Sequence, residues 1–195
     1  MSARVAPATG LQARLTVWFA RRLYGDPMAE STAIFARHPA LLRWYGLFNR
    51  AVERPRAVPE PLLHLAALKA ATVVDCAFCI DIGSEHARRA GLSDEQLLAL
   101  HDPEPSGLFS ADELLVVAYA DGLTRTPAVA DDAVAAALRE RFGDRGLMEL
   151  TYLIGWENLR ARLNVGLGIE AGGFSEGRVC ALPASAATAS VATEA

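Results

Sequence analysis

Apolar side chains recur every three or four residues along most of this 195-residue chain, which is the spacing of amphipathic helices. The first segment that shows it carries five of them: Leu11, Leu15, Trp18, Phe19 and Leu23. Two capping boxes, at residues 93–96 and 110–113, mark the starts of later helices. No segment shows the alternation of apolar and polar residues between hairpin turns that strands would require. The sequence therefore predicts an all-α fold of about eight helices.

Length and composition fit a single compact domain, because 52% hydrophobic residues are enough for a substantial core. Residues 1–10 are small and polar, and the tail from Pro183 onward is rich in Ala, Ser and Thr without periodicity. We therefore expect a helical domain at residues 11–175, with disordered segments at residues 1–10 and 176–195.

The charge and the apolar runs exclude several classes of partner. A formal net charge of −4 gives no indication of a nucleic-acid partner. No apolar run has the length of a membrane span, and the apolar stretch near the N-terminus is too short for a secretory signal. We expect a cytoplasmic protein that binds neither nucleic acid nor membrane. Three cysteines in such a chain argue against a disulfide framework and leave redox, metal or core roles open.

Two of the three cysteines, Cys76 and Cys79, are separated by only two residues. The preceding Asp75 can act as an N-cap, which would make Cys76 the first residue of a helix and put Cys79 on nearly the same face. The partial positive charge of a helix N-terminus favours a thiolate. The segment is therefore a candidate dithiol site.

Three interpretations of the pair compete. Both cysteines can be small core residues, since free cysteine is among the most buried residue types. A structural zinc site needs four ligands, and Cys76, Cys79 and His86 supply three, so we expect no bound metal. In the third interpretation, one thiolate attacks an oxidant such as a peroxide and becomes a sulfenic acid, which the second thiol converts to a disulfide.

Peroxide reduction also needs a proton donor for the leaving group. His86 follows Cys79 by seven residues, which is about 10 Å along a helix axis. His64 belongs to the preceding helix, and a turn before Asp75 could fold it back against the sulfurs. Both histidines are candidates for this role, although a lone histidine in an apolar helix is more often structural.

Beyond the cysteine motif, several segments in a fixed order resemble one known group, the carboxymuconolactone decarboxylase-like superfamily and, within it, the alkyl hydroperoxidase D-like proteins. The resemblance covers roughly residues 20 to 175. The segments that carry it are AFCIDIG at 77–83, FSADEL at 109–114, ELT at 149–151 and NLRARLNVGLG at 158–168.

The resemblance implies an all-helical homo-oligomer that acts as an antioxidant thiol peroxidase without a bound cofactor. It implies that Cys79 attacks a small peroxide substrate, and that Cys76 resolves the product and exchanges with an external thiol reductant, either a protein or a small molecule. The helix N-terminus alone would favour Cys76 as the more acidic thiol, and we follow the family for the attacking residue.

The chain departs from the family at the proton relay. Active members carry a Glu twelve residues before the first cysteine and a His four residues after the second, where this chain has His64 and Gly83. Peroxidase activity would then depend on His64 or His86 for proton transfer. The alternative is a non-catalytic or weakly active helical oligomer that kept the fold and lost the Glu/His relay.

Overall fold

The computed structural model describes residues 3–52, 54 and 57–181 of the chain. Over these residues the fold consists of nine α-helices and one short 3₁₀ helix, without a β-strand. The helices are α1 (Leu11–Tyr24), α2 (Ala29–Phe35), α3 (Pro39–Val52), α4 (Glu60–Val74), α5 (Ala77–Arg89), α6 (Asp94–Ala99), α7 (Pro103–Ser106), α8 (Ala111–Thr124) and α9 (Asp132–Leu167), with the 3₁₀ helix at Asp26–Met28. The predicted all-α fold is confirmed, with one α-helix more than the eight or so expected.

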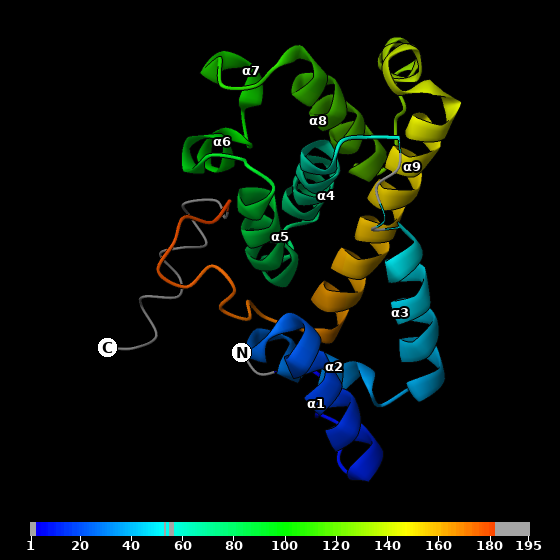
Figure 1. Cartoon of the computed structure of the whole chain (residues 1–195), viewed down its shortest axis with the longest axis vertical. Coiled ribbons are helices and arrows are strands. Elements are labelled where there is room, and N and C mark those ends of the chain that lie inside the picture. Colours follow the sequence, from blue (N-terminus) through cyan, green and yellow to red (C-terminus); the bar gives the residue numbers. More distant parts are fainter. Residues whose placement is uncertain (1–2, 53, 55–56, 182–195) are drawn as a thin grey trace.

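Helix α4 lies at the centre of the molecule and packs against α5, α8 and α9 (Figure 1). It carries apolar residues around its whole circumference, as expected of a helix that is surrounded by other elements, with Glu60, His64 and Lys69 as its charged or titratable residues. Leu65 and Leu68 belong to a core cluster shared with α5, whereas Leu63 and Ala66 belong to a second cluster shared with α8 and α9. The N-terminal helices α1 and α2 lie below this core in the figure, and α3 packs along α9.

Local side-chain caps define the starts of α6, α8 and α9. The two predicted capping boxes are present, at Ser93 with Gln96 for α6 and at Ser110 with Glu113 for α8. Asp131 caps α9 by accepting the backbone N–H groups of residues 133 and 134 at 2.9 and 3.0 Å. Helix α9 is kinked at Gly143, whose φ of 70° lies in the left-handed region that favours glycine.

The turn between α4 and α5 differs from the sequence-based expectation. Asp75 is not the N-cap of α5 but the residue that ends α4, in a left-handed conformation with φ 60° and ψ 48°. The N-cap of α5 is Cys76, whose sulfur accepts the backbone N–H of Cys79 at 3.2 Å. The physical reason is the short connection: a chain that reverses within two residues needs a left-handed residue to end the first helix. The next residue is then left to cap the second.

The described parts of both terminal segments lie against the helices. The backbone N–H of Arg4 bonds the carbonyl of Leu167 at 2.9 Å. On α5, the buried carboxylate of Asp81 accepts the backbone N–H groups of residues 173–175 at 2.7 to 3.0 Å, which ties the segment after α9 to this helix. The predicted disorder of residues 1–10 and 176–195 stays a prediction, since part of each range lies outside the described residues. Within the described ranges, no helix is both long and apolar enough to cross a membrane.

An ion pair between the buried Lys69 and the partly exposed Asp121 joins α4 to α8. Lys69 is 7% exposed, and its Nζ lies 3.2 Å from Oδ1 of Asp121. Burial alone would raise the pKa of Asp121, but the hydrogen bonds and positive charges of Arg125 and Lys69 outweigh it and lower this pKa. The ionised carboxylate is therefore part of the helix–helix contact.

We predict that Asp121→Asn lowers the free energy of unfolding at neutral pH by about 2–4 kcal/mol, because it leaves the Lys69 ammonium buried without its anion. Urea denaturation measures this loss. Lys69→Met removes the charge and keeps an apolar side chain of similar shape, so it should lower the free energy of unfolding clearly less.

Asp112→Asn is a matched control on the same helix, because Asp112 pairs with the exposed Arg141 and such surface pairs contribute about 0–1 kcal/mol. The difference in the free energy of unfolding between the wild type and Asp121→Asn should also become smaller in acid. A lowered pKa in the folded state adds stability that is lost as the pH falls through that pKa, below the ordinary value of about 3.9. If Asp121→Asn and Asp112→Asn lower the free energy of unfolding equally, the Lys69–Asp121 pair has no special role in stability.

Candidate active site

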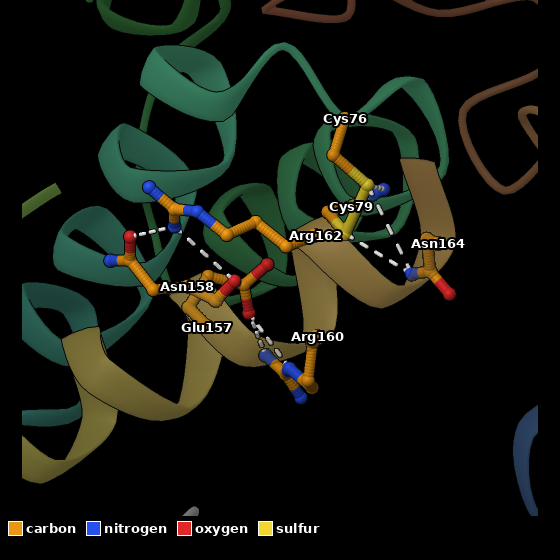
Figure 2. The surroundings of a disulfide bond; sticks show 7 residues. All are labelled: Cys76, Cys79, Glu157, Asn158, Arg160, Arg162 and Asn164. Carbon is orange, nitrogen blue, oxygen red and sulfur yellow. Dashed lines mark hydrogen bonds and ion pairs between the residues drawn. A yellow bond between two sulfur atoms is a disulfide. The ribbon is translucent and has the colours of Figure 1, made fainter. Parts of the chain in front are cut away.

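Cys76 and Cys79 are joined by a disulfide at the start of α5 (Figure 2). Their Cα atoms are 5.3 Å apart, within the range of disulfide-bonded residues. Both sulfurs belong to the core cluster between α4 and α5. The core interpretation and the redox interpretation of the pair are therefore compatible: the cysteines are packed residues that are also close enough to exchange electrons.

A cavity of about 350 Å³ lies against this pair. Its walls come from the N-terminal helices α1–α3 on one side and from α4, α5 and α9 on the other. Cys79 is part of the wall, whereas Cys76 is fully buried behind it, with 0% exposure against 5% for Cys79. A molecule in the cavity therefore meets the sulfur of Cys79 first.

Asn164 of α9 contacts both sulfurs. Its Nδ2 lies 3.3 Å from Sγ of Cys79 and 3.9 Å from Sγ of Cys76. Figure 2 shows the amide nitrogen turned toward the sulfurs and the amide oxygen turned away from them. An N–H donor at this distance stabilises a thiolate more than a thiol. Asn164 is therefore positioned to activate Cys79.

Sequence reasoning gave no role to Asn164, although a signal was available. Glu157, Ala161 and Asn164 follow one another at spacings of four and three, and all three are buried. Polar residues at the buried positions of a helix need a partner inside the protein. For Glu157 that partner is Arg160, whose Nε donates to its carboxylate at 2.8 Å.

The structure brings His64 and His86 together at the cavity wall. Their ring centroids are 5.6 Å apart in an edge-to-face arrangement. Nε2 of His64 lies 3.5 Å from a carboxylate oxygen of Glu60, one helical turn earlier on α4. The two histidines therefore share the cavity with Cys79, and their predicted role in proton transfer stays a prediction.

Gly83 stands where the family relay carries a histidine, and it also lies in the cavity wall. A Cβ atom at this position would meet Cδ1 of Leu68 at 3.2 Å. Helix α5 therefore approaches α4 closely at the site of the missing relay residue.

The two sulfurs beside a cavity are arranged for dithiol chemistry. Among the residues that the structure describes, no three or more His, Cys, Asp or Glu side chains are grouped to hold a metal ion. A dithiol beside a cavity can give two electrons to an oxidant and become a disulfide. The nearby imidazoles can move the accompanying protons.

Comparison with known proteins gives consistent relatives. The sequence profile of the carboxymuconolactone decarboxylase family matches residues 39–122. The uncharacterised protein YnjA of Escherichia coli K12 is 37% identical over 163 residues, which are 83% of this chain and 88% of YnjA.

Two solved structures have a similar fold. A protein of unknown function from Agrobacterium tumefaciens, provisionally named an antioxidant defence protein AhpD, has a TM-score of 0.65 at 23% identity, over 70% of this chain and 93% of that chain. The debrominase Bmp8, with one cysteine replaced by alanine and 2,3,4-tribromopyrrole bound, has a TM-score of 0.72 at 17% identity, over 88% and 94% of the two chains. At these identities the likeness concerns the fold.

We predict that Asn164→Leu slows the alkylation of Cys79 in the reduced protein by about three- to tenfold at neutral pH, because the thiolate loses a hydrogen-bond donor. Iodoacetamide labelling followed by peptide mass spectrometry gives the rate at each cysteine. Asn158→Leu is the matched control, since Asn158 lies on the same helix and bonds Thr124 rather than a sulfur. Equal rates in the two variants would exclude the thiolate-stabilising role.

Proposed function

Because the chain belongs to the carboxymuconolactone decarboxylase family, we propose that it is a thiol-dependent peroxidase that works through Cys76 and Cys79. One observation carries the proposal: the two sulfurs are close enough to form a disulfide, and one of them lines a cavity. A solely structural pair would have no need of access from a cavity. The likeness to an AhpD-type fold is compatible with this activity.

In the proposed reaction, the thiolate of Cys79 attacks the terminal oxygen of a hydroperoxide. The O–O bond breaks, Cys79 becomes a sulfenic acid, and the alkoxide leaves and takes a proton to become an alcohol. The thiol of Cys76 then attacks the sulfur of Cys79, so that the S–S bond forms and water is released. Two external thiols restore the dithiol and become a disulfide themselves.

Burial determines where the reductant attacks. The family resemblance assigns this exchange to Cys76, which is fully buried at the turn between α4 and α5. A protein reductant would therefore need that turn to open, whereas a low-molecular-weight thiol can enter the cavity and attack Cys79. Both routes belong in a reducing compartment such as the cytoplasm, where thiols are plentiful.

His64 is the proposed proton donor, with His86 beside it and Glu60 behind it. The carboxylate of Glu60 lies 3.5 Å from Nε2 of His64, one helical turn away on α4, and is placed to orient its ring. This arrangement supplies a carboxylate and two imidazoles at the cavity. His64 occupies the position of the relay glutamate, whereas Glu60 and His86 lie outside the relay positions. This grouping is the observation that favours an active enzyme over a fold that has lost its relay.

The cavity favours an organic substrate. A volume of about 350 Å³ is in the range of sites for small organic ligands and far exceeds what hydrogen peroxide needs. The debrominase of similar fold supports a second oxidant for the same dithiol, an organobromine compound. That exchange also balances: two thiols become a disulfide, bromide leaves, and the carbon takes a proton.

We also propose that the protein is a homo-oligomer, as the family resemblance implies. Large apolar side chains are exposed on α1 and α3, where a second copy can cover them. The most exposed are Leu11 at 73%, Leu23 at 72%, and Leu41 and Trp44 at 63% each.

We predict that a pulse of cumene hydroperoxide converts the reduced wild type to the Cys76–Cys79 disulfide. Cys76→Ser should stop at a sulfenic acid on Cys79 that dimedone traps, because no thiol is left to resolve it. In Cys79→Ser, the remaining thiol of Cys76 should react with the hydroperoxide no faster than a free thiol does. Mass spectrometry of the cysteine peptides distinguishes these products.

Cys180→Ser is the control for the third cysteine and should behave as the wild type. If the wild type keeps its free thiols at hydroperoxide concentrations that oxidise a control peroxidase, the non-catalytic oligomer is favoured. A parallel pulse with 2,3,4-tribromopyrrole tests the second oxidant by bromide release. If 2,3,4-tribromopyrrole forms the disulfide and the hydroperoxide does not, the peroxidase assignment is wrong and the organobromine compound is the oxidant.

We predict that His64→Ala slows peroxide-dependent disulfide formation by about 100-fold, the contribution typical of a positioned general acid. Stopped-flow measurement of the oxidation rate tests this, with iodoacetamide labelling as the second readout. Labelling of Cys79 should stay within about twofold of the wild type if His64 acts on the leaving group. His38→Ala is the control, since His38 lies outside the cavity wall. An unchanged oxidation rate in His64→Ala would exclude this histidine as the donor.

A further inference from the structure

Two side chains in the cavity wall form an ion pair that the proposed reaction does not use. Glu157 and Arg160 both line the cavity and lie three residues apart on α9. Nε of Arg160 donates to Oε2 of Glu157 at 2.8 Å, and Nη2 donates to the same oxygen. Glu157 is 3% exposed, whereas 20% of the Arg160 side chain is exposed. The guanidinium in this wall is therefore neutralised by a buried carboxylate of the protein itself.

Arg160 is also fixed from the other side of the cavity. Its Nη1 donates to Oδ1 of Asn49 on α3 at 2.8 Å, and the same oxygen accepts the indole N–H of Trp156 at 2.9 Å. All three nitrogens of the guanidinium thus donate to groups of the protein. Arg160 cannot turn toward a ligand without losing some of these hydrogen bonds.

The charges of the wall are unfavourable for an anionic ligand. Among the described residues that line the cavity, Arg160 is the only arginine or lysine, and it faces two carboxylates, those of Glu157 and Glu60. Glu60 lies on α4, 3.5 Å from Nε2 of His64. A charge that leaves water without gaining an opposite charge is buried at a high cost in free energy. A ligand carboxylate would have to compete with Glu157 for the one guanidinium.

We propose that the cavity accepts uncharged organic substrates and rejects carboxylates, and that Glu157 sets this selectivity by neutralising Arg160. The ion pair lies on the helix that carries Asn164, the residue in contact with Cys79 (Figure 2). Arg160 and Glu157 precede Asn164 by four and seven residues, which are about 6 and 10 Å along the helix axis. The pair therefore faces the part of a substrate that is remote from the reacting oxygen. The inference deepens the proposed function and rests on it for the identity of the reacting sulfur.

Removal of the negative charge of Glu157 should reverse the selectivity. In Glu157→Gln the side chain keeps its size and an oxygen that can accept from Arg160, but the charge of the guanidinium is no longer balanced. Most of the surrounding wall is apolar, with side chains such as Leu63, Ile82 and Leu153, so that opposite charges attract more strongly there than in water. A ligand carboxylate should then take the place of the missing anion.

The test uses 4-isopropylbenzamide and 4-isopropylbenzoate, which have nearly the same shape and differ in charge. Isothermal titration calorimetry measures both with the full chain in its disulfide form. The wild type should bind the amide at least about tenfold more tightly than the benzoate. Glu157→Gln should bind the benzoate at least about tenfold more tightly than the wild type does, the effect of one hydrogen bond between charged groups. Its affinity for the amide should stay within about twofold of the wild type.

Glu85→Gln is the matched control, because Glu85 is also buried and also pairs with an arginine three residues later, Arg88, but lies outside the cavity wall. It should keep the preference of the wild type. Addition of Arg160→Met to Glu157→Gln should remove the gain in benzoate affinity.

The wild type alone can overturn the inference, if it binds the benzoate as tightly as the amide or binds neither compound. A folded Glu157→Gln without a gain in benzoate affinity would overturn it as well, as would a gain that persists after Arg160→Met. The disulfide form does not turn over, so these outcomes are independent of the peroxide pulse that tests the proposed function.

Discussion

One residue with a left-handed backbone conformation, Asp75, determines where the cysteine pair lies. Asp75 ends α4 and allows α5 to begin two residues later, so that the two helices pack closely and Cys76 becomes the cap of the second. The cysteine pair is thereby held at a helix N-terminus inside the core rather than on an exposed loop. The sulfur of Cys76 accepts a backbone N–H within the same turn, and that of Cys79 reaches the cavity. Two chemically identical side chains thus have different surroundings.

Helix α9 completes the site from the other side. Its buried face carries two polar residues, Glu157 and Asn164, in a row of otherwise apolar contacts. Burial of such groups is unfavourable unless each has a partner, and Arg160 provides one for Glu157. Asn164 contacts the sulfurs with one atom only. The cavity wall is therefore polar at a few defined points and apolar elsewhere.

Features with a local cause could be predicted from the sequence, whereas features that depend on packing could not. The capping boxes at Ser93 and Ser110 depend on residues three apart, and the pairing of Cys76 with Cys79 depends on a similar spacing. The assignment of Asp75 as an N-cap was wrong because the connection between α4 and α5 is set by how the helices pack. The contact of Asn164 with the sulfurs joins residues 85 apart in the chain. The helical spacing of Glu157 and Asn164 could have indicated two buried polar residues, but it does not identify the sulfurs as the partner. The roles of His64 and His86 stay predictions, although the structure brings both to the cavity.

Gly83 lies where the family relay carries a histidine, and the space around it is tight. A side chain at this position would press on Leu68, which is fully buried in the core between α4 and α5. Overpacking of this kind typically costs about 1–3 kcal/mol. A side chain at position 83 would therefore require a shift of Leu68 by a few tenths of an ångström. Glycine at position 83 therefore lets α5 lie close against α4 beside the cavity.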